Sequence, residues 1–236
     1  MKLSAPIYHL KRHAKLMARD ENIPLHSALD RIATREGFKS WSMLSSQHTD
    51  LISAQQIYKY LKAGEMVLVG ARPGHGKTLL SLEILIEAMK KGNRGLFFSL
   101  DYTSKDVAKR FAMLNASEHH FDGLFVFDSC EEICADYIIA QAHNEPQGTC
   151  IVIDYLQLLD QKRSKPELMV QVIALREFAR QKAMTILCIT QIDRTFDPEV
   201  KTCPDIDDVR LPNPVDLSLF SKACFLNNGI VKLHSL

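Results

Sequence analysis

The fold of this chain is decided by Ala71-Arg72-Pro73-Gly74-His75-Gly76-Lys77-Thr78. An apolar run, residues 66–69, precedes this stretch, and an amphipathic segment follows it from Leu79 to Met89. Strand, glycine-rich turn and helix is the context that a phosphate-binding loop requires. Backbone N–H groups in such a turn donate to phosphate oxygens, and the helix adds the positive end of its dipole. We therefore predict that residues 72–79 bind a nucleotide, with Ala71 where the usual pattern has glycine; the alternative is an ordinary glycine-rich turn.

A second motif supports the first. The run Thr149-Cys150-Ile151-Val152-Ile153-Asp154 has the composition of a buried parallel strand that ends in one carboxylate. Ligands of open α/β sheets collect at the carboxyl ends of the strands. Lys77 is expected on the β- and γ-phosphates, and the Thr78 hydroxyl and Asp154 on opposite sides of Mg²⁺. Taken alone, Asp154 would be interpreted as a helix cap or a turn residue.

Composition limits the class of protein. The 236 residues can bury one substantial core and a small appendage, and 46% hydrophobic with 24% charged residues is typical of a soluble globular protein. A net charge of +1 gives no general attraction for nucleic acid, so such binding requires local patches. Neither a membrane-spanning run nor a secretory signal is evident. The six scattered cysteines indicate reduced thiols in the cytoplasm rather than a disulfide framework or a zinc site.

Strand and helix patterns alternate from Glu65 onward. We expect strands at 66–70, 96–100, 124–127, 149–154 and 184–190, and helices over 79–91, 104–114, 129–143 and 166–181. Ser129 and Glu132 predict a capping box for the third helix, and Pro166 suits the first turn of the fourth. The tail predicts strands over 215–220 and 223–233, the latter broken by an Asn228-Gly229 hairpin turn. This order predicts an α/β fold: a mostly parallel twisted sheet with helices on both faces.

The first fifty residues form a separate pattern. Three short helices are expected at 7–18, 24–36 and 40–46, closed in the second case by Gly37, and another connecting helix within 50–63. We therefore divide the chain into a small helical unit, residues 1–50, and an ATPase-like domain, residues 51–236. Five basic residues come before Asp20, the first acidic residue of the unit. This pattern indicates either nucleic-acid binding or a solvated helix face. The basic residues are Lys2, Lys11, Arg12, Lys15 and Arg19.

With these pieces placed, residues 61–233 resemble the C-terminal ATPase domain of DnaB-type replicative helicases, in the RecA-like group of P-loop ATPases. The matching segments are 61–65, the Ala-Arg-Pro loop with Gly76-Lys77-Thr78, Phe97-Phe98-Ser99-Leu100-Asp101, residues 151–159 including Asp154-Tyr155-Leu156-Gln157, and Thr190-Gln191-Ile192-Asp193-Arg194. Residues 208–210 and 215–217 match the last block more loosely. The first fifty residues do not resemble the family's primase-binding helical domain.

The resemblance implies roles for matching residues. The family has a glutamate base after the second strand, and this chain has Asp101, whose carboxylate reaches less far by one methylene. A misplacement of that size can cost about a hundredfold in rate, so slow hydrolysis is expected. Gln191 matches the γ-phosphate sensor, although alone it would be interpreted as an ordinary strand-end residue. ATP and Mg²⁺ are the implied cofactors.

The resemblance also implies a ring, expected to be a hexamer, whose channel loops hold single-stranded DNA. The first loop offers Lys162, Arg163 and Lys165, and the second offers Arg194 within a mostly acidic segment. The family's trans-acting arginine finger has no evident counterpart, because Lys222 lies in that region and no arginine follows Arg210.

Several functions remain open at this point. The first is a Mg²⁺-dependent ATPase of the DnaB-like group that acts as a ring on single-stranded DNA. The second is an ATP-binding switch or assembly scaffold, with a protein partner on the N-terminal helices; Asp101, the missing finger and the acidic second loop favour it. A KaiC- or RadA-like ATPase is disfavoured by the Ala-Arg-Pro loop, and a small-molecule kinase by the absence of an evident lid segment.

Overall fold

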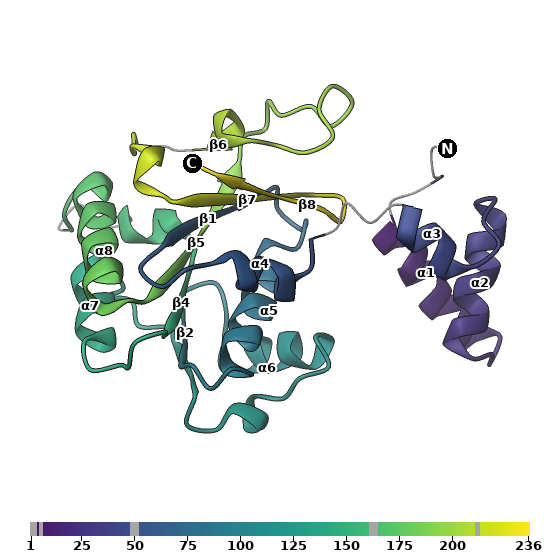
Figure 1. Cartoon of the computed structure of the whole chain (residues 1–236), viewed down its shortest axis with the longest axis horizontal. Coiled ribbons are helices and arrows are strands. Elements are labelled where there is room, and N and C mark those ends of the chain that lie inside the picture. The colour runs from purple at the N-terminus through teal and green to yellow at the C-terminus, as the bar shows by residue number, and fades with distance from the viewer. Residues whose placement is uncertain (1–3, 5–6, 48–51, 161–164, 211–212) are drawn as a thin grey trace.

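A mostly parallel eight-stranded sheet forms the centre of the protein. The computed structural model describes the chain except residues 1–3, 5–6, 48–51, 161–164 and 211–212 (Figure 1). The strand order is β3-β2-β4-β5-β1-β7-β8, with β6 paired to β5. Neighbours from β3 to β7 are parallel, whereas the β5–β6 and β7–β8 pairs are antiparallel. The strands are β1 (Met66–Ala71), β2 (Gly95–Ser99), β3 (Phe125–Asp128), β4 (Cys150–Asp154), β5 (Thr185–Ile192), β6 (Val209–Arg210), β7 (Lys222–Asn227) and β8 (Ile230–Ser235).

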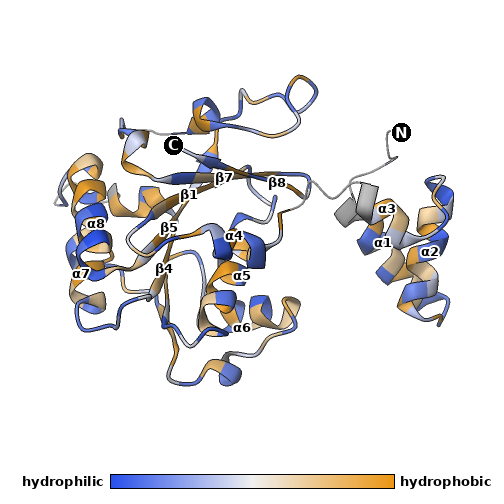
Figure 2. Ribbon diagram, viewed as in Figure 1, coloured by the Kyte–Doolittle hydropathy of each residue, from blue (hydrophilic) through white to orange (hydrophobic). Residues whose placement is uncertain are grey.

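Helices cover both faces of this sheet, as the alternating sequence pattern predicted (Figure 1). The helices are α4 (Ala54–Tyr60), α5 (Lys77–Met89), α6 (Ser104–Met113), α7 (Ala135–Ala142) and α8 (Leu168–Lys182). Every residue of β1 is buried, and its side chains alternate between two apolar clusters. Val67 and Val69 pack with α4, α5 and α6, whereas Met66 and Leu68 pack with α7 and α8. Two-sided burial explains the continuous apolar runs of the central strands (Figure 2).

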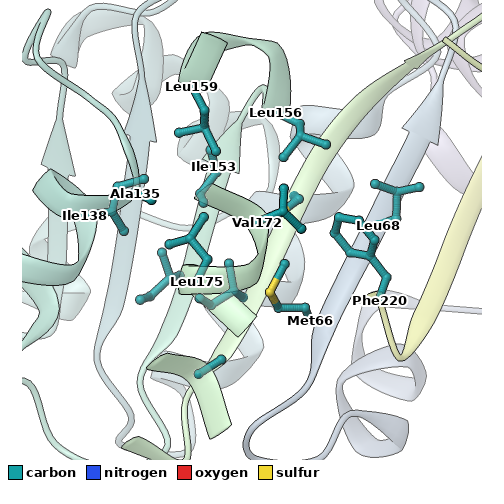
Figure 3. Close-up of a cluster of buried hydrophobic side chains, with 14 of the residues drawn as sticks. Met66, Leu68, Ala135, Ile138, Ile153, Leu156, Leu159, Val172, Leu175 and Phe220 are labelled. Carbon is teal, nitrogen blue, oxygen red and sulfur yellow. The ribbon is translucent and has the colours of Figure 1, made fainter. Parts of the chain in front are cut away.

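Figure 3 shows the second of these clusters. Met66 and Leu68 of β1 lie near Phe220, and Val172 and Leu175 of α8 belong to the same cluster. The cluster fixes α8 against the strand that ends in Asp154, because Ile153 belongs to it. Among the described residues, no helix has both the length and the apolarity needed to cross a membrane. All six cysteines are free.

The N-terminal helices are α1 (Ile7–Asp20), α2 (Leu25–Arg35) and α3 (Trp41–Gln47), close to the predicted ranges. They bury an apolar cluster of their own, which includes Leu10, Ile32 and Leu44. Gly37 ends α2 with a φ of 86°, a conformation that favours glycine. The predicted boundary at residue 50 lies outside the described residues.

Three local predictions were wrong. Ser129 and Glu132 form no capping box: α7 begins at Ala135, because the Asp128 carboxylate accepts the Cys130 N–H and holds the preceding residues in a turn. Pro166 precedes the first turn of α8, because Glu167 is the N-cap residue of that helix. The Pro166 carbonyl accepts a hydrogen bond from the Gln171 side chain.

The third wrong prediction is the strand over residues 215–220. These residues instead include a 3₁₀ turn, Leu217–Leu219, because the Asp216 carboxylate caps the Ser218 N–H at 2.9 Å. The short strand β6 was not predicted from the sequence. The predicted hairpin is confirmed, with β7 and β8 joined at Asn228-Gly229.

The end of β1 has no room for a side chain at Gly70. A Cβ there would lie 2.9 Å from the Phe225 ring and 3.1 Å from Ile192 Cδ1. We expect Gly70→Ala to lower the free energy of unfolding by about 1–3 kcal/mol through overpacking. Denaturant titration measures the loss, and the same substitution in a Phe225→Leu background is the control. An equal loss in both backgrounds would contradict this steric explanation.

Candidate functional site

The loop between β1 and α5 has the geometry of a phosphate cradle. Gly74 and Gly76 have φ values of 80° and 89°, which non-glycine residues rarely adopt. A Cβ built at either position would meet no atom within 4 Å, so the glycines serve the turn and the space beside it is open. Gly76 is the N-cap residue of α5, and Lys77 begins the helix. The backbone N–H groups at this helix start suit an anionic ligand.

The Thr78 hydroxyl and the Asp154 carboxylate meet at this loop. Thr78 Oγ1 donates to Asp154 Oδ2 at 2.7 Å, across 76 residues of sequence. Both residues are buried, with exposed fractions of 7% and 2%. The contact brings the two motifs together as the sequence predicted, at the carboxyl ends of the parallel strands.

Burial shifts the pKa values of the ionisable groups in this site. It raises the pKa of Asp154 to about 6, against the Thr78 hydrogen bond and the positive charge of Lys77, which both lower it. Burial also lowers the pKa of Lys77, whereas the Asp154 and Asp101 carboxylates act in the opposite direction. The ionised forms of Lys77 and Asp154 therefore stabilise each other in a place where water solvates neither group well.

Asp101 and Gln191 lie at the carboxyl ends of β2 and β5, two parallel strands with β4 between them. Asp101 follows β2, is exposed, and donates its backbone N–H to Ser99 Oγ at 3.2 Å. Its charge raises the pKa of Asp154, so its carboxylate lies within electrostatic reach of the site. Gln191 pairs in register with Ala71, where the phosphate loop begins. The structure thus gathers Lys77, Thr78 and these strand-end residues at one edge of the sheet.

Two residues that the sequence did not single out also contact this site. The Tyr102 hydroxyl lies 3.3 Å from Thr78 Oγ1, and the Arg110 guanidinium stacks 4.3 Å from the centre of the Tyr102 ring. The positive charge of Arg110 lowers the pKa of Asp154. For Tyr102, the signal was its position directly after Asp101. Arg110 lies in the last turn of α6, and no spacing between it and a motif indicates that it belongs to the site.

Other side chains of the loop point away from the cradle. Arg72 Nη2 donates to the Arg194 carbonyl at 3.0 Å and also to the Phe196 carbonyl. His75 Nδ1 accepts the Asn228 N–H at 3.3 Å, and burial, followed by the charges of Arg72 and Lys77, lowers its pKa. Pro73 is exposed, and Leu79 is half-buried in α5.

The predicted DNA-contacting residues are spread over different surroundings. Lys162 and Arg163 lie outside the described residues. Lys165 Nζ forms an ion pair with Glu132 Oε2 at 2.7 Å. Arg194 is exposed in the segment after β5.

Lys222 lies far from the phosphate loop along its strand. It starts β7, pairs in register with Val67, and forms a half-buried ion pair with Glu65. The strand runs parallel to β1, so Lys222 lies at the amino end of the sheet, whereas the cradle lies at the carboxyl end.

A hydrated divalent cation suits the donor set at the cradle. Hydroxyl and carboxylate oxygens are the ligands that Mg²⁺ prefers, and the hydrogen-bonded Thr78–Asp154 pair presents both. Over the described residues, no group of three His, Cys, Asp or Glu side chains is placed to hold a metal ion. A cation here would therefore take its other ligands from phosphate and water, as Mg²⁺ commonly does.

Solved structures with the same architecture identify the fold. An ATPase domain of known structure aligns with a TM-score of 0.56 at 16% identity, covering 78% of this chain and 79% of that one. A DnaB-like replicative helicase, from a structure that describes its interactions with primase, aligns with a TM-score of 0.60 at 14% identity, covering 92% and 66%. A KaiC-like protein from Pyrococcus horikoshii aligns at 0.51 and 16%, covering 69% and 70%. The fold is that of the RecA-like P-loop ATPases, as predicted.

Sequence comparison narrows this class. The family model for the DnaB-like helicase C-terminal domain matches residues 47–123. The replicative helicase DnaB of Mycoplasma pneumoniae is 25% identical over 203 residues, covering 67% of this chain and 42% of the relative. The Helicobacter pylori DnaB is 23% identical over 232 residues, covering 83% and 47%. These comparisons confirm the predicted resemblance to a DnaB-type C-terminal ATPase domain. The chain spans less than half the length of these curated relatives.

The raised pKa of Asp154 has a consequence for stability. The folded state binds more protons than the unfolded state between pH 3.8 and about 6, so this carboxylate destabilises the fold increasingly as pH rises through that range. We expect Asp154→Asn to raise the free energy of unfolding at pH 7.5 by about 1–3 kcal/mol, and by less at pH 5. Urea titrations at both pH values measure the difference. The matched control is Asp122→Asn, because Asp122 is exposed. If Asp154→Asn raised the free energy of unfolding equally at both pH values, the raised pKa of Asp154 would be contradicted.

Proposed function

We propose that the chain is a Mg²⁺-dependent ATPase of the DnaB-like helicase group that acts in the cytoplasm on single-stranded DNA as a ring, expected to be a hexamer. The observation that carries the proposal is the 2.7 Å contact between Thr78 and Asp154 beside an open glycine cradle. A buried carboxylate held by a hydroxyl at a helix start suits a phosphate-bound cation.

Each residue of the site has a proposed part. Backbone N–H groups of residues 72–79 bind phosphate oxygens, and Lys77 places its ammonium on the β- and γ-phosphates. Thr78 and Asp154 hold Mg²⁺, which when bound neutralises charge on the phosphates. Asp101 orients the attacking water and accepts its proton, and the Gln191 amide donates to the γ-phosphate.

The partners in this proposal follow from the relatives. The curated relatives are named replicative DNA helicases, which supports single-stranded DNA as the substrate. The contacts to DNA are assigned to Lys162, Arg163, Lys165 and Arg194. Lys165 must leave Glu132 to take part, which adds a cost to its contact with DNA. A protein partner on the N-terminal helices is a further part of the proposal.

A second candidate is an ATP-binding switch or assembly scaffold with weak hydrolysis. Specific placements favour it: Asp101 is a short carboxylate, and Lys222 forms an ion pair at the opposite end of the sheet from the cradle. Nucleotide binding would then control association rather than drive movement on DNA. Stimulation of hydrolysis by DNA separates the two functions.

The deciding experiment measures ATP turnover with and without single-stranded DNA, on samples whose mass is determined by light scattering. We expect ATP and Mg²⁺ to promote a ring and DNA to stimulate turnover, because active sites of this class form between subunits. Lys77→Ala should abolish nucleotide binding without unfolding the protein, since it removes charge from the ligand and not packing from the core. Lys90→Ala, at the other end of α5, is the control. A fully active monomer would contradict ring assembly, and turnover unaffected by DNA would favour the switch.

Asp101 provides an independent test. We expect Asp101→Asn to lower turnover by about a hundredfold with little change in ATP affinity, because it removes the base and not a phosphate contact. Asp101→Glu should keep or raise turnover, since it restores the longer reach. Steady-state kinetics and equilibrium nucleotide binding measure both effects. Equal turnover in all three proteins would remove Asp101 from the mechanism.

A further inference from the structure

We propose that Arg72 is a positioning residue that couples nucleotide binding to the segment after β5, residues 193–204, which we call the post-β5 segment. This inference rests on the proposed function, because it requires a nucleotide in the loop that contains Arg72. The coupling runs through the side chain of Arg72, whereas the backbone of the same residue belongs to the phosphate cradle.

The contacts of Arg72 define a clamp. Its guanidinium donates to the carbonyls of Arg194 and Phe196, which lie 122 and 124 residues further along the chain. It also lies over the Phe196 ring, 5.3 Å from the ring centre. Phe196 is only 3% exposed, so the ring is fixed in the apolar core beneath the segment. A planar guanidinium can make two hydrogen bonds and a stacking contact at once, which a lysine ammonium cannot.

The loop reaches the other end of the same segment through His75. His75 accepts the Asn228 N–H, and the neighbouring Asn227 side chain donates to the Thr202 carbonyl at 3.0 Å. Cys203 Sγ contacts the Phe225 carbonyl at 3.4 Å, which fixes that end on β7. The phosphate loop is therefore linked to the start of the post-β5 segment directly and to its end through the β7–β8 turn.

Between these anchors the segment is held by local contacts. The Asp193 carboxylate caps the Thr195 N–H at 2.9 Å, and Lys201 pairs with Asp208 at 2.9 Å. These bonds stabilise the turns of the segment but do not connect it to the cradle. Arg72 supplies that connection, so ordering of the phosphate loop by a nucleotide stabilises the clamped position of residues 194–196. Because such coupling is reciprocal, loss of the clamp weakens nucleotide binding by the same factor by which the nucleotide stabilises the clamped position.

Trypsin reports the clamp directly, because the bond after Arg194 contains the carbonyl that Arg72 holds. Cleavage there requires local opening of the segment. In the full chain without nucleotide, we expect Arg72→Gln and Arg72→Lys to speed cleavage of the Arg194–Thr195 bond at least about fivefold. Phe196→Leu, which leaves the phosphate loop intact, should act in the same direction. The control is Arg94→Gln, because Arg94 also donates to a backbone carbonyl, that of Gly123, and pairs with Glu145, away from the segment.

The second arm adds MgADP, with binding followed separately by a fluorescent ADP analogue. In the wild type, we expect saturating MgADP to slow cleavage at Arg194 about fivefold, and in the Arg72 and Phe196 variants this protection should disappear. A merely structural role for Arg72 would change basal cleavage and leave the protection by MgADP intact, which would overturn the coupling. Unchanged basal cleavage in Arg72→Gln would overturn the clamp. Binding without protection in the wild type would overturn the coupling alone, whereas absence of binding would overturn the proposed function as well.

Discussion

The hydrogen bond from Thr78 to Asp154 is the constraint on which the site depends. It joins the start of α5, which follows β1, to the end of β4, and β5 lies between these two strands in the sheet. The bond requires both intervening registers to be correct, from Ile153 opposite Cys188 to Gln191 opposite Ala71. A slip of one residue would turn Asp154 to the other face of the sheet. The two apolar clusters, which take alternate residues of β1, fix these registers and thereby the site.

Burial of the Asp154 carboxylate makes the site costly for the fold. A carboxylate that is 2% exposed loses its hydration, and one hydroxyl with a partly desolvated ammonium compensates for only part of the loss. Packing around β4 keeps Asp154 in place despite this cost, because Ile151, Val152 and Ile153 are fully buried beside it. A cation and phosphates would supply the missing charge interactions, so this one residue lowers the stability of the free protein in favour of ligand binding.

Local patterns determined how much of this structure the sequence could predict. The strands and the glycine-rich loop are local signals, and the placement of Thr78 opposite Asp154 followed from the rule that parallel strands end at one edge. Two of the three failures have a common cause: a side chain accepted a nearby N–H and created a turn that competes with helix or strand, as Asp128 and Asp216 do. The contacts of Arg72 with residues 194–196 and of Arg110 with Tyr102 depend on tertiary packing, which no spacing in the sequence encodes.

The charge balance of the site indicates at which step the two proposed functions, an ATP-driven helicase and an ATP-binding switch, differ. Within one chain, Lys77 and Arg110 oppose Asp101 and Asp154, so their formal charges cancel. A triphosphate with one divalent cation would remain net negative in this surrounding, and the charge that develops on the phosphates during hydrolysis needs further positive groups. Lys222 does not supply one in its own chain, because it pairs with Glu65 at the other end of β7. Under the proposed function, a single subunit would bind the nucleotide with the groups it has, whereas fast hydrolysis would require a cation from a neighbouring subunit. Assembly, rather than nucleotide binding, is the step at which an ATP-driven helicase and an ATP-binding switch differ.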